Sequence, residues 1–149
     1  KVNLAISLNA TTDELRHQIM PAANRLHSLQ ALLAACRDYP LADRDRLTFE
    51  YVLLADVNDR PEDATRLIKL LRGLRCKVNL IAFNPFPGSP YRRPTEAAIE
   101  LFQSTLRRGH VDAYLRRSRG RDVLGACGQL GRIEVSQAPI TLTQIQTRC

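Results

Sequence analysis

Along this chain, segments with the hydrophobic pattern of buried strands alternate with segments that have the pattern of amphipathic helices. Runs of mainly apolar residues, each followed by a polar stretch, predict four strands, at 2–8, 47–54, 77–83 and 111–115. Between them apolar residues recur every three or four positions, and a last short helix is predicted at 123–130. The pattern therefore predicts strands and helices in regular alternation.

Local signals mark where the helices begin and end. Thr11, with Glu14 three residues later, predicts an N-cap with a capping box. Further helix starts are predicted from capping hydroxyls or from a proline in the first turn, at Ser28, Pro61 and Thr95. Gly73 and Gly109 predict helix ends.

This alternation predicts an α/β fold in which parallel strands are joined by right-handed crossovers. Four strands are too few to close a barrel, so the unit is either a small open sheet or part of a larger α/β barrel. In both, functional residues gather where the strands end. We expect one unit at residues 1–131 and a polar C-terminal tail at 132–149.

Composition narrows the class of protein. The 149 residues are 44% hydrophobic and 25% charged, as in a globular domain, and no apolar run is long enough to span a membrane. Lys1 enters a strand pattern directly and there is no initiating Met, so we expect the chain to be cut from a longer protein. Without a signal-like N-terminus, we predict a cytoplasmic location.

Positive charge is concentrated near the C-terminus. The net charge is +7, and residues 105–132 hold seven Arg and two Asp, a local excess of 7 − 2 = +5. Guanidinium groups suit bidentate contacts with phosphates, which favours nucleic-acid binding, although an arginine-rich solvated surface would give the same composition. The candidate nucleic-acid contacts are Arg116, Arg117, Arg119 and Arg121.

The four cysteines, at 36, 76, 127 and 149, have no close spacing, so we predict no metal ligands in this chain. Cys36 and Cys76 fit core positions. Cys127 lies among Gly and Ala residues and follows the arginine cluster, which would lower a thiol pKa. It is either a reactive thiol or a buried structural one, and the local pattern leaves both open.

Polar residues at the predicted strand ends are candidates for ligand binding. Ser7 and Asn9 flank the first strand end, where turn chemistry is the alternative explanation. Asn84, held extended by Pro85, opens a proline-rich loop. Glu50 and Asn79, within strands, either point into a barrel lumen or, as we favour, are buried and hydrogen bonded.

Several segments together resemble one family, the radical S-adenosylmethionine (SAM) adenine-C2 RNA methyltransferases of the RlmN/Cfr type. The most specific are Asn-Pro-Phe-Pro-Gly-Ser-Pro-Tyr at 84–91 and Ala-Cys-Gly-Gln-Leu at 126–130. Other matching segments are 4–10, 13–16, 48–54, 57–59, 76–81, 83 and 119–120. The resemblance covers about residues 2 to 131 and implies part of an incomplete radical SAM (β/α) barrel.

The resemblance also implies roles for individual residues. Ser7, Leu8, Asn9 and Asn84 match SAM contacts, and Cys127 matches the cysteine that becomes S-methylated. In that family one SAM methylates the thiolate. A second, reduced by a [4Fe-4S] cluster, yields a 5′-deoxyadenosyl radical that takes a hydrogen from the S-methyl group. The carbon radical then adds to C2 of an adenine in 23S rRNA or in tRNA.

Two departures limit what the resemblance implies. The family usually has His where this chain has Asn9, and its cluster-binding cysteines and second catalytic cysteine lie N-terminal to the matching region. We therefore expect the C-terminal portion of the enzyme, dependent on an external reductant. By itself this portion should be inactive and prone to self-association. The alternatives are a non-catalytic RNA-binding module or another iron–sulfur radical SAM or redox enzyme on the same scaffold.

Overall fold

The structure, a computed structural model, describes residues 4–116 as an α/β unit built on a parallel sheet. Its strands, in the spatial order β1-β2-β3-β4, are β1 (Ala5–Ser7), β2 (Leu47–Leu53), β3 (Cys76–Ala82) and β4 (Ala113–Arg116). The predicted fold class is confirmed. The helix predicted at 123–130, the tail at 132–149 and the candidates Arg117, Arg119, Arg121 and Cys127 lie outside the described residues.

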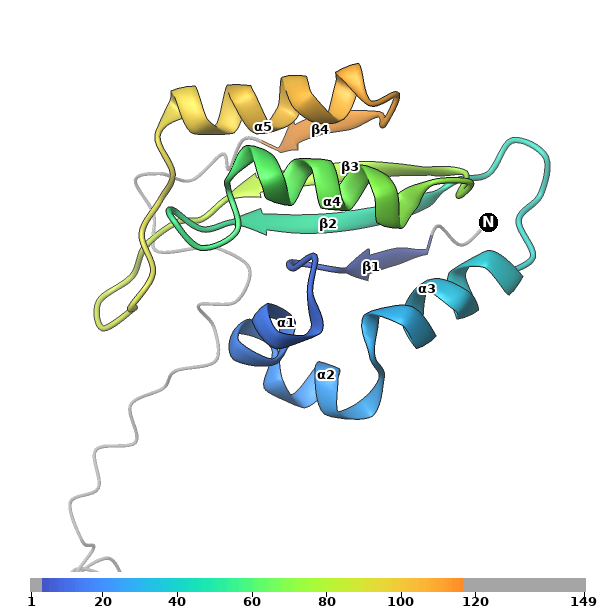
Figure 1. The fold of residues 1–149 in the computed structure, drawn as a ribbon, viewed down its shortest axis with the longest axis horizontal. Helices are drawn as coiled ribbons and strands as arrows, with labels where there is room; N and C mark the ends of the chain where they lie inside the picture. The colour runs from blue at the N-terminus through green and yellow to red at the C-terminus, as the bar shows by residue number, and fades with distance from the viewer. Residues whose placement is uncertain (1–3, 117–149) are drawn as a thin grey trace, which may run out of the picture.

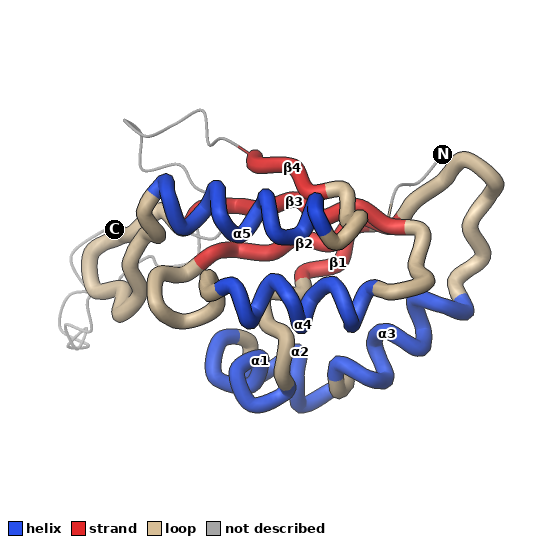
Figure 2. Tube along the Cα trace, turned by 45° about the horizontal axis from the view of Figure 1, so that its top comes forward, coloured by secondary structure: helices blue, strands red, loops and turns tan. Residues whose placement is uncertain are grey.

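The helices gather on one face of the sheet (Figures 1 and 2). They are α1 (Asp13–Ile19), α2 (Pro21–Leu26) and α3 (Leu29–Asp38) between β1 and β2, α4 (Pro61–Leu71) before β3, and α5 (Glu96–Arg108) before β4. Each crossover leads to the next strand in the same direction, so right-handed connections put every helix on the same side. None of these helices is long and apolar enough to cross a membrane.

In the first crossover one predicted N-cap was wrong and one helix was not predicted. The N-cap of α1 is Thr12, whose hydroxyl accepts a hydrogen bond from the Leu15 N–H, because Thr11 is buried and donates instead to Asp63 of α4, at 3.2 Å. The sequence analysis also missed α2, although its Pro21 occupies the first turn, where proline is favoured. The N-caps predicted at Ser28 and Thr95 are confirmed.

The core lies between the helices and the sheet face that they cover. Alternate strand side chains that point to this face are fully buried: Phe49, Tyr51, Leu53, Val78 and Leu80. The ring of Tyr51 stacks on that of Phe102 from α5, with 5.4 Å between the centroids. Burial of each large apolar side chain contributes about 1.5–3 kcal/mol. This face therefore supplies most of the stability of the described unit.

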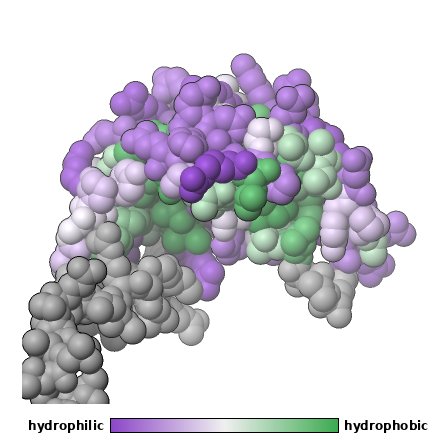
Figure 3. Space-filling view, turned by 90° about the horizontal axis from the view of Figure 1, so that it is seen from below, coloured by the Kyte–Doolittle hydropathy of each residue, from purple (hydrophilic) through white to green (hydrophobic). Residues whose placement is uncertain are grey.

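The opposite face of the sheet carries a row of polar side chains that runs across the four strands. Ser7, Glu50, Asn79 and Tyr114 are register partners across the four strands. The burial that we favoured for Glu50 and Asn79 is wrong, because both side chains are only half-buried on a face that no helix among residues 4–116 covers. In Figure 3, hydrophilic residues cover the helical side, and hydrophobic residues come into view toward the other side.

Candidate ligand site at the carboxyl ends of the strands

All four strands point the same way, so their carboxyl ends meet along one edge of the sheet (Figure 1). Ser7 ends β1, with Leu8 and Asn9 directly after it, Asn84 follows β3, and Arg116 ends β4. Residues predicted from three separate segments are thus brought to the same edge. This is where open α/β sheets bind ligands.

Ser7 lies on the face of the sheet that no helix among residues 4–116 covers, called the bare face below. Its side chain is exposed, and its hydroxyl has no hydrogen-bond partner within the part of the chain that the structure describes. Asn84 is half-buried, and its amide likewise has no partner among residues 4–116. These two polar groups are therefore available to a ligand.

Leu8 and Asn9 are engaged within the fold. The Leu8 side chain is fully buried in the core, and its N–H donates to the Glu50 carbonyl at 2.9 Å. Asn9 has a φ of 57°, a left-handed conformation that Asn tolerates better than most residues. Its side-chain oxygen accepts from the Val52 N–H at 2.8 Å, and its side-chain nitrogen lies 3.2 Å from Met20 Sδ.

Asn58, which the sequence analysis did not single out, joins two of these strand ends. It is fully buried, and its side-chain nitrogen donates to the carbonyls of Asn9 and Val52, both at 2.8 Å. Its side-chain oxygen accepts from the Leu54 N–H at 2.7 Å. The sequence signals were an Asn in a polar loop after a strand, which turn chemistry explains equally well, and the family match at 57–59, which gave Asn58 no role.

The proline-rich loop after β3 is packed at its base. The Phe83 ring makes edge contacts with Phe86 and Tyr91, with centroids 6.2 and 6.3 Å apart. Gly88, at a φ of 81°, and a hydrogen bond from the Ser89 N–H to the Phe86 carbonyl form a tight turn. The loop is also joined to the end of β2, since the Ala55 N–H donates to the Arg92 carbonyl at 2.9 Å.

Guanidinium groups along this edge are paired with carboxylates. Arg92 contacts Asp56 at 2.6 Å, and Arg116, the one predicted RNA contact within the described residues, lies 3.8 Å from Glu50. Burial, reinforced by neighbouring carboxylates, raises the pKa of Asp59, which accepts from the Asp56 N–H. Arg116 keeps 63% of its side chain exposed, so its pairing with Glu50 leaves it accessible to a phosphate.

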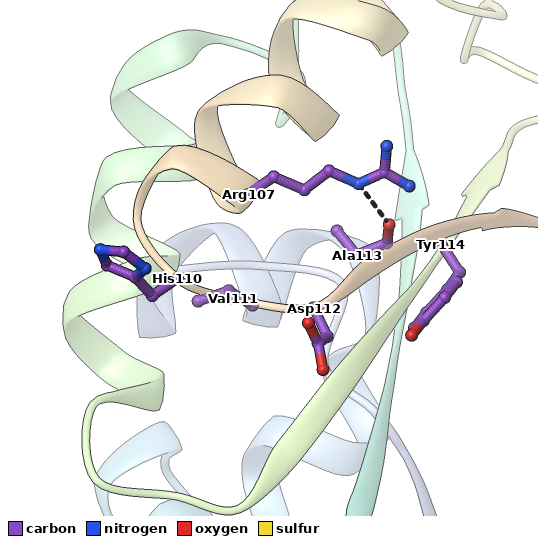
Figure 4. A pocket seen from close by; sticks show the side chains of 6 residues that line it. All are labelled: Arg107, His110, Val111, Asp112, Ala113 and Tyr114. Atoms are coloured by element: carbon purple, nitrogen blue, oxygen red, sulfur yellow. Dashed lines mark hydrogen bonds between the residues drawn. The ribbon is translucent and has the colours of Figure 1, made fainter.

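Two cavities lined by described residues lie away from this edge. One of about 360 Å³ lies at the start of β4, where Arg107 of α5 reaches across to donate to the Ala113 carbonyl at 3.1 Å (Figure 4). Gln103 donates to the same carbonyl, so side chains occupy this outward-facing group of the edge strand. A second cavity, of about 390 Å³, lies between the start of α1 and helices α3 and α4.

The described cysteines match their predicted core positions. Cys36 is buried and Cys76 half-buried, and both are free thiols. Burial raises the pKa of both groups, that of Cys76 to about 11. Neither thiol is suited to be a nucleophile at neutral pH, because the thiolate is the reactive form.

Comparisons with known proteins agree with this geometry. Over 129 residues, or 87% of the chain, it is 52% identical to the dual-specificity RNA methyltransferase RlmN of Syntrophobacter fumaroxidans. It is 53% identical over 137 residues to the RlmN of Syntrophotalea carbinolica. A crystal structure of a radical SAM methyltransferase from Sphaerobacter thermophilus superposes over 87% of the chain with a TM-score of 0.82 and 46% identity.

The chain is homologous to part of the RlmN-type RNA methyltransferases. The resemblance seen in the sequence is thereby confirmed, although the chain matches no protein-family model. It spans 37% of the length of both RlmN relatives and 38% of the solved methyltransferase. A domain of a pyruvate-formate lyase-activating enzyme from Bacteroides vulgatus shares the fold, at 14% identity and a TM-score of 0.59.

Proposed function

We propose that this chain forms part of a radical SAM enzyme that methylates C2 of an adenine in 23S rRNA, and in tRNA, through an S-methylated Cys127. One observation carries the proposal. A sheet that superposes on a radical SAM methyltransferase at a TM-score of 0.82 presents Ser7, a polar side chain without a partner among residues 4–116, at its carboxyl edge. The reaction takes place in the cytoplasm and uses an external reductant.

The residues at this edge fit a SAM molecule in part. The Ser7 hydroxyl and the Asn84 amide are available to bind its polar groups, while Leu8, with its side chain in the core, offers only its main chain. The amide of Asn9 is engaged by Val52 and Met20, which supports a main-chain role for Asn9 as well. When bound, SAM supplies the methyl group and, with a [4Fe-4S] cluster, the radical chemistry. We propose that the cluster ligands lie outside this chain.

RNA approaches the same edge from the β4 side. Arg116 ends β4 with an exposed guanidinium, and Arg117, Arg119 and Arg121 follow it in the chain. Guanidinium contacts with phosphates position an RNA without reading its sequence. The proposal therefore gives these arginines affinity for RNA and leaves the chemistry to Cys127, six residues after Arg121.

The test uses the full-length gene product, reconstituted anaerobically, with methyl-labelled SAM and a 23S rRNA fragment. Cys127→Ala should abolish both RNA methylation and labelling of the protein. Ser7→Ala should weaken SAM binding about tenfold, the loss expected for one hydrogen bond of about 1.4 kcal/mol. Ser104→Ala is the matched control, because Ser104 lies on the exposed face of α5 and its hydroxyl donates to the Leu101 carbonyl of the same helix.

The same experiment separates the alternatives. Salt-dependent RNA binding that survives Cys127→Ala, without methylation by the wild type, would support an RNA-binding module instead. Methylation by the 149-residue chain alone would contradict the proposal that the cluster ligands lie outside it.

A further inference from the structure

The hydrogen-bonded ladder between β1 and β2 stops abruptly at the candidate site. Register pairing ends at Ser7 and Glu50, and the last ladder bond runs from the Leu8 N–H to the Glu50 carbonyl. In a continued parallel ladder, the next groups on β2, the N–H and carbonyl of Val52, would bond to Leu8 and Ala10. Instead the Ala10 N–H donates to the Leu8 carbonyl at 2.8 Å, so the chain turns away from β2.

Two side-chain amides replace the missing ladder bonds. The Val52 N–H donates to the Asn9 side-chain oxygen, and the Val52 carbonyl accepts from the Asn58 side-chain nitrogen, both at 2.8 Å. The second N–H of that nitrogen donates to the Asn9 carbonyl at 2.8 Å. The amide of Asn58 therefore holds the turn after β1 at a fixed separation from β2.

Asn58 has little freedom to move. It is fully buried, its side-chain oxygen accepts from the Leu54 N–H, and its main-chain carbonyl accepts from the Tyr51 hydroxyl at 3.0 Å. The Tyr51 ring is itself fixed in the core by stacking on Phe102. The position of the turn at Asn9 is thus linked, through Asn58, to the core.

We infer that Asn58 is a positioning residue for the ligand site at the end of β1. By replacing the ladder with a side-chain bridge, it separates the two strands just after Ser7 and holds the turn at Asn9, whose main chain is left-handed. A ligand that contacts this segment then meets a preformed surface, without the cost of ordering a loop. The inference rests on the proposed function, in which Ser7 and its neighbours contact SAM.

The test compares ligand affinity with stability in the full-length gene product. Asn58→Asp keeps the shape and the acceptor for the Leu54 N–H, but sets an oxygen against the carbonyls of Asn9 and Val52. Titration calorimetry with S-adenosylhomocysteine, at a temperature where the variant is folded, should show affinity at least tenfold weaker. Tyr51→Phe, which removes one support of Asn58, should weaken binding about threefold.

The control is Leu106→Ala, which opens a cavity beneath the last turn of α5, beside the start of β4, since the Leu106 carbonyl accepts from the Val111 N–H. It should lower the melting temperature at least as much as Asn58→Asp and leave affinity within twofold of the wild type. If both Asn58→Asp and Tyr51→Phe bind as tightly as the wild type while melting lower, Asn58 is only structural. If Asn58→Asp fails to fold, the affinity of Tyr51→Phe for S-adenosylhomocysteine decides whether Asn58 positions the site.

Ser7→Ala keeps the two ideas separate. If Ser7→Ala binds S-adenosylhomocysteine more weakly while Asn58→Asp and Tyr51→Phe bind it normally, the positioning role is overturned. The proposed function then still stands. A wild-type protein that binds neither S-adenosylhomocysteine nor SAM overturns both.

Discussion

The two faces of the sheet differ in what they contribute to the molecule. On the helical face, neighbouring strands place fully buried Phe49, Tyr51 and Leu80 against α4 and α5, whereas on the other face the same strands place half-exposed Glu50 and Asn79. The first set removes apolar surface from water, and the second adds little to the stability of this unit. The difference indicates that the helical face maintains the fold, and that within residues 4–116 the other face is left open for binding.

The largest test of this comparison uses two adjacent residues of β3. Leu80→Ala should lower the free energy of unfolding by about 2–5 kcal/mol, because it leaves a cavity in a close-packed core. Asn79→Ala should change it by about 0.5 kcal/mol or less, as for a surface substitution. Urea unfolding of both variants measures the difference. Similar losses for the two would show that the bare face is packed in solution.

A smaller effect is expected from pH, because Cys76 lies on the helical face. Burial raises its pKa from 9.0 to about 11, so the neutral thiol favours the folded state. Its contribution is fully present below pH 9, where the unfolded chain also keeps the proton, and is lost as the pH rises through 11. The urea midpoint should therefore fall over this window more steeply in the wild type than in Cys76→Ala. Equal slopes would contradict the burial of this thiol.

The smallest effect is expected for the ion pair on the bare face. Glu50 and Arg116 are 3.8 Å apart with 30% and 63% of their side chains exposed, so Glu50→Gln should change the free energy of unfolding by less than about 1 kcal/mol. The matched control is Asp112→Asn, which breaks the exposed pair with Arg46 at the other end of β4. Both changes should vanish in 1 M salt. A loss that persists there would place Glu50 in a buried environment.

The two outer strands of the described sheet, β1 and β4, differ in how their free edges are covered. Among the described residues β1 pairs only with β2, and its Ala5 and Ser7 side chains are exposed. The β4 edge differs, since Gln103 and Arg107 already occupy its Ala113 carbonyl. Self-association of the 149-residue chain therefore stays a prediction, and the structure favours β1 as the edge that would mediate it.

Local patterns were enough to predict much of the fold. Period-2 and period-3.6 hydrophobicity predicted the strands and most helices, and Ser28, Thr95 and Gly109 marked helix ends where the structure has them. They failed at Thr11 and Thr12, because both can cap a helix and only the contact with Asp63 of α4 decides between them. For Glu50 and Asn79, periodicity showed that they share a face but not whether anything covers it.

By itself, the sequence determined the order of elements, the parallel sheet and the resemblance to RlmN-type enzymes, since all of these follow from local periodicity or from motifs. Only the tertiary structure decided that Ser7 is available, that the amide of Asn9 is engaged, and that Asn58 joins two strand ends. The physical reason is that a hydrogen bond between residues 49 positions apart depends on the packing of whole strands. No local pattern around Asn9 or around Asn58 predicts this hydrogen bond.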